Sequence, residues 1–289
     1  MTNTNTAETP HIQEVNGLNL HYVTWGKFTQ PENAVLLVHG LTANYLEWSL
    51  LGPTLAERGW YAIAPDLRGR GQSDKPPHGY GIPYHANDLL ALCDALNLPT
   101  VHLIGHSLGA QIGYFLAAIH PRRLGKLVLV DTGGRVPPDA LQAIGPALER
   151  LGKTYPSLDA YLQERKQSPA HSWNPFWEAY YRYDAEVQSD GTVKSRVPKA
   201  AIEEEISVNT SLNPDVLLSR IHAPTLIARA PMGTLAPDRG FLMAPDEAER
   251  VKGIIAGSRV VEIPNTNHYT IILSEVFPRE VLSFLTGSN

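Results

Sequence analysis

The stretch VHLIGHSLGAQIGYFLAAIH, residues 101–120, passes from an apolar run typical of a buried strand into the apolar spacing of an amphipathic helix. Between the two lies Gly105-His106-Ser107-Leu108-Gly109. A serine on so sharp a strand-to-helix turn must tolerate strained backbone angles, and glycines at both flanking positions let the neighbouring chain approach it. We therefore expect the hydroxyl of Ser107 to be exposed at the edge of a sheet as a nucleophile.

The rest of the chain alternates between short runs rich in Val, Ile and Leu and segments with helical periodicity, which is the pattern of helices packed on a mostly parallel sheet. Buried strands are predicted at residues 34–38, 61–64, 101–104, 126–130, 225–228 and 260–263, after an antiparallel pair near 12–15 and 20–25. Core helices are predicted at 48–58, 83–96, 108–120, 246–255 and 277–285. The predicted fold class is α/β, with an eight-stranded sheet and helices on both faces.

One interval breaks this alternation. Between residues 130 and 225 no strand of core type is evident, and helical segments at 140–153, 158–166, 175–183 and 199–207 are punctuated by Pro and Gly. We interpret residues 134–220 as a helical cap, residues 11–133 and 221–289 as the core, and residues 1–10 as a disordered tail. Trp173, Trp177 and Tyr180 in the cap are candidate substrate contacts, with attachment of the cap to the core as the alternative.

Composition restricts the classes of partner. A formal charge of −5 and the lack of a Lys/Arg cluster argue against nucleic acid. The longest apolar runs fall far short of the ~20 residues of a membrane helix, and the first residues lack the features of a secretory signal. The single cysteine, Cys93, is expected to pack as a small apolar group in a helix. A cytoplasmic protein is expected, and its oligomeric state stays open.

The expected base is His268, in the loop that follows a strand-like segment near 260–263 and leads into a helix. An imidazole there reaches the sheet edge where Ser107 projects, and its pKa suits proton transfer near neutral pH. His39 and His106 adjoin the site but are interpreted as packed residues of backbone-positioning motifs. No histidine pair shows metal-ligand spacing with a carboxylate, so neither a metal nor another cofactor is expected.

Two backbone amides are candidate donors to an oxyanion. Leu108 begins the helix after Ser107, so its N–H is unpaired and benefits from the helix dipole. Leu41 lies in the turn His39-Gly40-Leu41-Thr42 after the strand at 34–38, where glycine lets the backbone curl toward the serine.

Taken together, HGLT at 39–42, PDLRGRGQSD at 65–74, GHSLG at 105–109 and the late NHY at 267–269 resemble the α/β-hydrolase superfamily, over nearly the whole chain. The resemblance implies a cap inserted after the sixth strand and a triad in the order serine, acid, histidine. Most members carry the acid after the seventh strand, but PMGT at 231–234 holds no carboxylate. Asp131, at the end of the sixth strand, is the preferred acid, and Asp238 is the alternative. This arrangement is also similar to acetamidomethylenesuccinate hydrolase, an amide-cleaving member.

The expected activity is hydrolysis of a carboxylic ester of a small, partly apolar substrate through an acyl-enzyme intermediate, in the carboxylesterase class EC 3.1.1. An amidase or a carbon–carbon bond hydrolase using the same triad is the alternative within serine chemistry. A hydrolase-fold receptor that binds a ligand without turnover is the alternative outside enzymes. The cap arginines Arg135, Arg150, Arg165 and Arg182 are expected to be solvated helix residues rather than a clamp for a substrate carboxylate.

Overall fold

A single sheet forms the centre of the computed structural model, which describes residues 6–135, 139–168 and 170–287. Its strands are β1 (Thr9–Val15), β2 (Leu18–Trp25), β3 (Ala34–Val38), β4 (Tyr61–Pro65), β5 (Val101–His106), β6 (Leu124–Val130), β9 (Thr225–Arg229) and β10 (Arg259–Glu262). They lie in the order β1-β2-β4-β3-β5-β6-β9-β10. All neighbouring pairs from β4 to β10 are parallel, whereas β2 is antiparallel to both β1 and β4. The predicted eight-stranded, mostly parallel sheet is confirmed.

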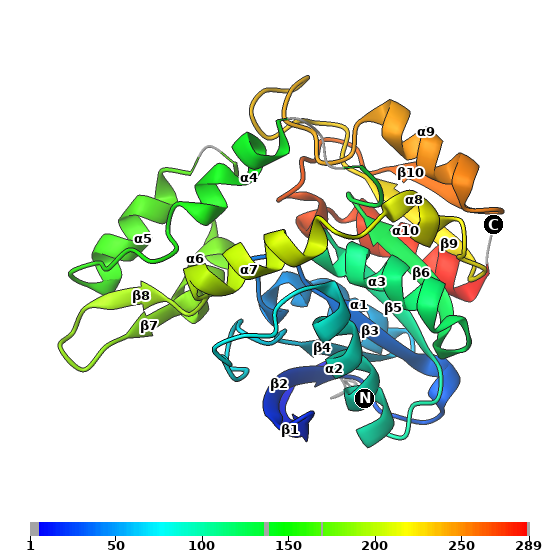
Figure 1. The fold of residues 1–289 in the computed structure, drawn as a ribbon, viewed down its shortest axis with the longest axis horizontal. Coiled ribbons are helices and arrows are strands. Elements are labelled where there is room, and N and C mark those ends of the chain that lie inside the picture. Colours follow the sequence, from blue (N-terminus) through cyan, green and yellow to red (C-terminus); the bar gives the residue numbers. More distant parts are fainter. Residues whose placement is uncertain (1–5, 136–138, 169, 288–289) are drawn as a thin grey trace.

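Helices cover both faces of this sheet (Figure 1). One apolar layer includes side chains of α2 (Ile82–Ala95), α3 (Leu108–Ile119), α8 (Pro214–Leu218) and α9 (Pro245–Ile254), and the other includes α1 (Leu51–Glu57) and α10 (Val276–Thr286). In β3, Leu36 and Val38 belong to the first layer and Val35 and Leu37 to the second. Because alternate residues of a strand point to opposite faces, a wholly apolar strand like this one is buried on both sides.

The connection from β6 to the core helix α8 forms a separate group of elements, which we call the insertion (residues 139–213). It contains α4 (Ala140–Leu148), α5 (Leu158–Lys166), α6 (Pro175–Asp184), β7 (Ala185–Val187), β8 (Val193–Ser195) and α7 (Lys199–Asn209). In Figure 1 it runs from green to yellow on the left of the sheet, with the β7–β8 hairpin at its outer end. Asn174 caps α6 by accepting from the amide of Trp177, and Pro175 takes the first helical position.

Several boundaries differ from those predicted from the sequence. β1 begins at Thr9, so the tail assigned to residues 1–10 is too long, and residues 1–5 lie outside the described residues. The helix predicted at 48–58 is divided into a short 3₁₀ helix at Tyr45–Trp48 and α1. The β7–β8 hairpin was missed, although Asp190-Gly191 is a common hairpin-turn pair. β10 is a half-exposed edge strand rather than a buried one.

The cap boundary predicted at residue 220 also lies too late. Leu217 and Leu218 of α8 pack in the apolar layer beside α3, so this helix belongs to the core. Cys93 is buried in α2, as expected, and burial raises the pKa of its thiol to about 12. A thiol so buried and so weakly acidic is a packing residue.

Candidate active site

Ser107 occupies a strained turn between β5 and α3. Its φ is 53° and its ψ is −117°, and its amide donates to the carbonyl of Val130 in β6 at 3.1 Å. A Cβ atom at Gly105 would lie 2.1 Å from the carbonyl oxygen of Gly109, and one at Gly109 would lie 2.0 Å from that of Val38. Both glycines are therefore required by close backbone contacts that hold the turn against β3.

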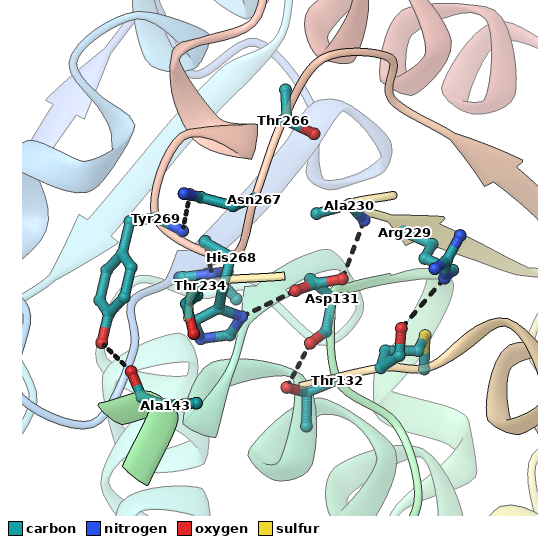
Figure 2. Close-up of polar contacts among 12 residues, drawn as sticks. Asp131, Thr132, Ala143, Arg229, Ala230, Thr234, Thr266, Asn267, His268 and Tyr269 are labelled. Atoms are coloured by element: carbon teal, nitrogen blue, oxygen red, sulfur yellow. Dashed lines mark hydrogen bonds and ion pairs between the residues drawn. The ribbon is translucent and has the colours of Figure 1, made fainter. Parts of the chain in front are cut away.

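His268 and Asp131 form a hydrogen-bonded pair, although 137 positions separate them in the sequence (Figure 2). The Nδ1 atom of His268 lies 2.8 Å from Oδ2 of Asp131. Because an ionised carboxylate only accepts hydrogen bonds, Nδ1 carries the proton in the neutral ring and Nε2 is left as the acceptor. This is the tautomer that a general base needs in order to remove a proton from a serine.

Asp131 is fixed by the neighbouring strand β9. Its Oδ1 accepts from the amide of Ala230 at 2.8 Å, and its own amide donates to the carbonyl of Ala228 at 2.7 Å. Its φ is 50°, a left-handed value that is costly for a non-glycine residue. Among the described non-glycine residues with positive φ, only Ser107 and Asp131 are not asparagines. Backbone strain of this kind concentrates at functional sites.

Asp238, the alternative acid, lies elsewhere. It is exposed in the turn between Ala236 and Arg239. The structure thus brings Asp131, and not Asp238, to the ring of His268.

The environment of His268 keeps the ring neutral. The side chain is buried, and burial is the largest cause that lowers its pKa below the ordinary value. His106 adds to this effect, while the hydrogen bond and charge of Asp131 oppose it. A neutral imidazole is therefore favoured over a wider range of pH than in free histidine.

The predicted oxyanion donors lie in the same cavity as Ser107 and His268. The carbonyl of Gly40 accepts from His39 Nδ1 at 2.8 Å and from the amide of Ala43 at 3.2 Å. In a trans peptide the N–H points away from the C=O, so these two bonds turn the amide of Leu41 to the opposite side. Among the described residues the Leu41 amide has no hydrogen-bond partner, and Leu108 begins α3, where amides lack intrahelical acceptors.

His39 works as a structural residue of this loop, as expected. Its Nε2 accepts from the amide of Leu67 at 3.0 Å while its Nδ1 donates to Gly40. Both ring nitrogens are used by the backbone, so His39 has no free atom for proton transfer.

The cavity above Ser107 has a volume of about 580 Å³ and is mostly apolar. Trp177 and Tyr180 line it, as predicted, and so does Tyr181, which is not among the predicted contacts. Trp173 does not line it: this ring stacks on Tyr181, with the ring centroids 5.9 Å apart. Other apolar members of the wall are Leu41, Tyr114, Ile144, Leu148, Ile206 and Leu242.

The expectation that the cap arginines are solvated is wrong for two of them. Arg150 and Arg165 are buried, whereas Arg135 and Arg182 are exposed. Arg150 donates from Nε to Asp184 at 2.9 Å and from Nη2 to the carbonyl of Thr42 at 2.6 Å. Burial of an arginine requires such partners, and the sequence does not show that a carboxylate 34 positions away will supply one.

Two further properties bear on function. In the ranges that the structure describes, no group of three or more His, Cys, Asp or Glu side chains is arranged to hold a metal ion. Nor does the described part of the chain contain a helix with the length and apolar character needed to cross a bilayer.

Comparison with known proteins places the chain in a family. The profile of the alpha/beta hydrolase fold family matches residues 33–275. The chain therefore belongs to the α/β-hydrolase fold family, and it is a hydrolase of that superfamily. Family membership leaves the bond that it cleaves unspecified.

Individual relatives match the chain either over a short segment or at low identity. An uncharacterized protein of Mycobacterium tuberculosis is 40% identical over 101 residues, which are 35% of this chain and only 29% of that protein. The putative carbamate hydrolase RutD of Caulobacter vibrioides is 26% identical over 272 residues, which cover 93% of this chain and 96% of the relative. The crystal structure of E-2-(acetamidomethylene)succinate hydrolase superposes with a TM-score of 0.82 at 20% identity, over 97% of this chain and 100% of that chain. This last likeness shows a common fold.

Proposed function

We propose that the protein is a serine hydrolase that cleaves carboxylic esters of small, uncharged, partly apolar acids. The observation that carries the proposal is the Nδ1–Oδ2 hydrogen bond between His268 and Asp131, beside a strained Ser107 in the same cavity. These residue types in these roles form the machinery of acyl transfer to water. The partner is accordingly a small-molecule ester.

The proposed reaction has two steps. The Ser107 oxygen attacks the ester carbonyl carbon, and its proton passes to Nε2 of His268 while the Leu41 and Leu108 amides bind the oxyanion. Collapse of the intermediate breaks the bond to the alcohol, which takes the proton from Nε2 and leaves. Water then attacks the acyl-serine by the same route, releases the carboxylic acid and restores Ser107. Asp131 keeps the ring in its tautomer and stabilises the imidazolium.

The lining of the cavity supports an uncharged acyl group. Among the described residues of the wall, Arg135 and Arg150 are the two with a permanent positive charge, and each is paired with an aspartate of the protein. A substrate carboxylate at the buried Arg150 would have to displace Asp184, and at the exposed Arg135 solvent weakens the attraction for a charged group. Aromatic and aliphatic side chains instead offer burial to an alkyl or aryl group.

The test is intact-protein mass spectrometry during turnover of p-nitrophenyl acetate, butanoate and hexanoate, with Ser107→Ala as the comparison. We expect an acyl adduct on the wild-type chain and loss of both adduct and turnover in the variant. Turnover that survives Ser107→Ala would overturn the serine mechanism. Binding of the esters, seen as a raised melting temperature, without any hydrolysis would favour a receptor.

Carbamates are the second candidate substrates. The likeness to a protein named a putative carbamate hydrolase, over 93% of this chain, favours them. The attack and the proton transfers would be the same, and the group held on Ser107 would be a carbamoyl group instead of an acyl group. A p-nitrophenyl N-alkylcarbamate in the same assay separates the two: faster turnover of the carbamate than of the acetate would put carbamates first.

A further inference from the structure

A second buried pair of a carboxylate and a histidine lies beside the site. Glu47, in the 3₁₀ helix that follows β3, is 6% exposed, and His106, the last residue of β5, is 3% exposed. Glu47 Oε1 lies 3.0 Å from Nδ1 of His106. The proposed reaction uses neither side chain, although both line the cavity.

Each of these residues has a further contact in the site. Glu47 Oε2 accepts from the amide of Gly40 at 2.9 Å, directly before the proposed oxyanion donor. His106 Nε2 lies 3.0 Å from the carbonyl oxygen of His268, and the two rings lie 4.5 Å apart with an angle of 37° between their planes. The pair thus connects three segments: the oxyanion loop, defined here as residues 39–42; the turn of Ser107, to which His106 itself belongs; and the loop that carries His268.

The contacts also fix the charge of His106. Nδ1 faces a carboxylate and Nε2 faces a carbonyl oxygen, and both of these groups accept hydrogen bonds. Both ring nitrogens therefore donate, which only the protonated ring can do. Burial by itself would lower the pKa of His106, but Glu47 outweighs it and the net shift is upward. Burial likewise acts to raise the pKa of Glu47, and His106 reverses it.

We propose that Glu47 and His106 form a positioning ion pair that fixes the oxyanion loop and the His268 loop relative to Ser107 and holds a positive charge beside the His268 ring. The proposal rests on the proposed function for its effect on turnover. The effect of the His106 charge on His268, in contrast, can be tested in the protein without substrate. It assigns no proton transfer to either residue.

Other charged and titratable groups around the pair determine how far His106 shifts the pKa of His268. His268 faces Asp131 and Glu47, whose negative charges oppose that of His106. Glu47 also interacts with His39, and the hydroxyl of Tyr180 in the insertion lies in its field. Burial and His106 still lower the pKa of His268, so its base form persists into mildly acidic solution. Loss of the positive charge should raise that pKa and move the acidic limb of kcat/KM to higher pH.

Two replacements of His106 remove its charge, and each keeps one of its two contacts. His106→Asn keeps a donor where Nδ1 lies, toward Glu47, and loses the contact with His268. His106→Gln keeps a donor near Nε2, toward the carbonyl of His268, and loses the one toward Glu47. Neither amide carries a charge. His21→Gln is the matched control, because His21 forms a buried pair with Asp66 at 2.8 Å and does not line the cavity.

We expect both His106 variants to lower kcat at least roughly tenfold with KM within about threefold, since the donors to the transition state are displaced. In both, the acidic limb should move up by roughly half a pH unit or more. Glu47→Gln should lower kcat similarly, and His21→Gln should leave kcat and the limb unchanged. Melting temperatures identify any variant that fails to fold.

An NMR titration of the His268 ring in a Ser107→Ala background gives a readout that needs no turnover. We expect its midpoint to rise when His106→Gln is added. If folded His106 variants keep both the wild-type kcat and the wild-type midpoint, the proposal is overturned. If the midpoint moves in a protein that cleaves no ester, the charge assignment stands and the proposed function fails instead.

Discussion

The two walls of the cavity are built in different ways. On the core side, Ser107 and Leu41 line the cavity and Asp131 lies buried behind it. They follow β5, β3 and β6, so parallel strands deliver them to one edge of the sheet and backbone contacts hold them. On the insertion side, Trp177 and Tyr180 lie on α6 and present mainly apolar surface. The proposed reactive groups are thus held by several backbone contacts, whereas the proposed substrate contacts are helix side chains that can be replaced without moving the backbone.

The two walls meet at the oxyanion loop. From the core, Arg70 donates to the carbonyl of Leu41 at 2.9 Å and pairs with Glu205 of α7. From the insertion, Arg150 donates to the carbonyl and hydroxyl of Thr42 and pairs with Asp184. Consecutive carbonyls of this loop are thus held by buried arginines whose carboxylate partners lie in the insertion. At this loop, therefore, the core side and the insertion side of the cavity are not independent of each other.

The largest effect should come from the core side, with Asp131→Asn. The Ala230 amide will hold the asparagine oxygen, so its NH₂ group faces Nδ1 of His268 and forces that atom to accept. The proton then sits on Nε2, and the base is lost. We expect kcat for p-nitrophenyl butanoate to fall at least about a hundredfold. Asp238→Asn is the control, and a larger loss there than at Asp131 would contradict the assignment of the acid.

An intermediate effect is expected where the walls meet, with Arg150→Met. The change leaves Asp184 buried without its cation, which should cost about 3–5 kcal/mol of unfolding free energy. It also frees the carbonyl of Thr42, so kcat should drop roughly tenfold in protein that is still folded. Chemical denaturation and steady-state kinetics measure the two effects.

Arg182→Met is the matched control for that prediction. Arg182 lies in the same insertion and forms an exposed pair with Glu178 at 2.8 Å. Such pairs contribute little, so stability and kcat should stay near wild type. If Arg150→Met destabilises the fold but leaves kcat intact, the insertion is not coupled to the oxyanion loop.

The smallest effect should come from the insertion wall, with Trp177→Leu. Less apolar surface would meet a long acyl chain, so kcat/KM should fall roughly tenfold for the hexanoate ester and roughly two- to threefold for the acetate. The same change at Trp173, which lies outside the cavity, should alter neither value. An equal loss for acetate and hexanoate would show that Trp177 supports the fold rather than the acyl group.

Local pattern was enough to predict the strands of the eight-stranded sheet and the position of Ser107. The turn requires Gly105 and Gly109 because the backbone carbonyls of Gly109 and Val38 approach them so closely. Both glycines belong to the five-residue motif at 105–109 and can be recognised in the sequence. The acid was harder to predict, since the choice between Asp131 and Asp238 depends on which carboxylate reaches a ring 137 or 30 positions away along the chain. Asp131 is favoured by the pairing of β6 with β9, which the sequence does not show.

Residues whose role depends on a distant partner could not be predicted. Glu47 lies 59 positions from His106, and Arg150 lies 34 from Asp184, so nothing local marks them as buried. Trp173 and Trp177 are both predicted as substrate contacts because the sequence does not show where the helix begins or which face of it meets the cavity. Trp173 precedes the Asn174 cap of α6 and Trp177 follows it, which places them on different surfaces.

The clamp between Arg150 and Thr42 affects how this chain could be recombined with others. A chimera that exchanged the insertion for one of another architecture would remove Arg150 and Asp184 together, and leave the Thr42 carbonyl in the core without its donor. Transplantation of the insertion alone would thus alter catalytic geometry even when the graft folds. The unit to exchange is the insertion together with residues 41–43, so that the contacted loop is inherited with the insertion while Glu47 stays with His106 in the core.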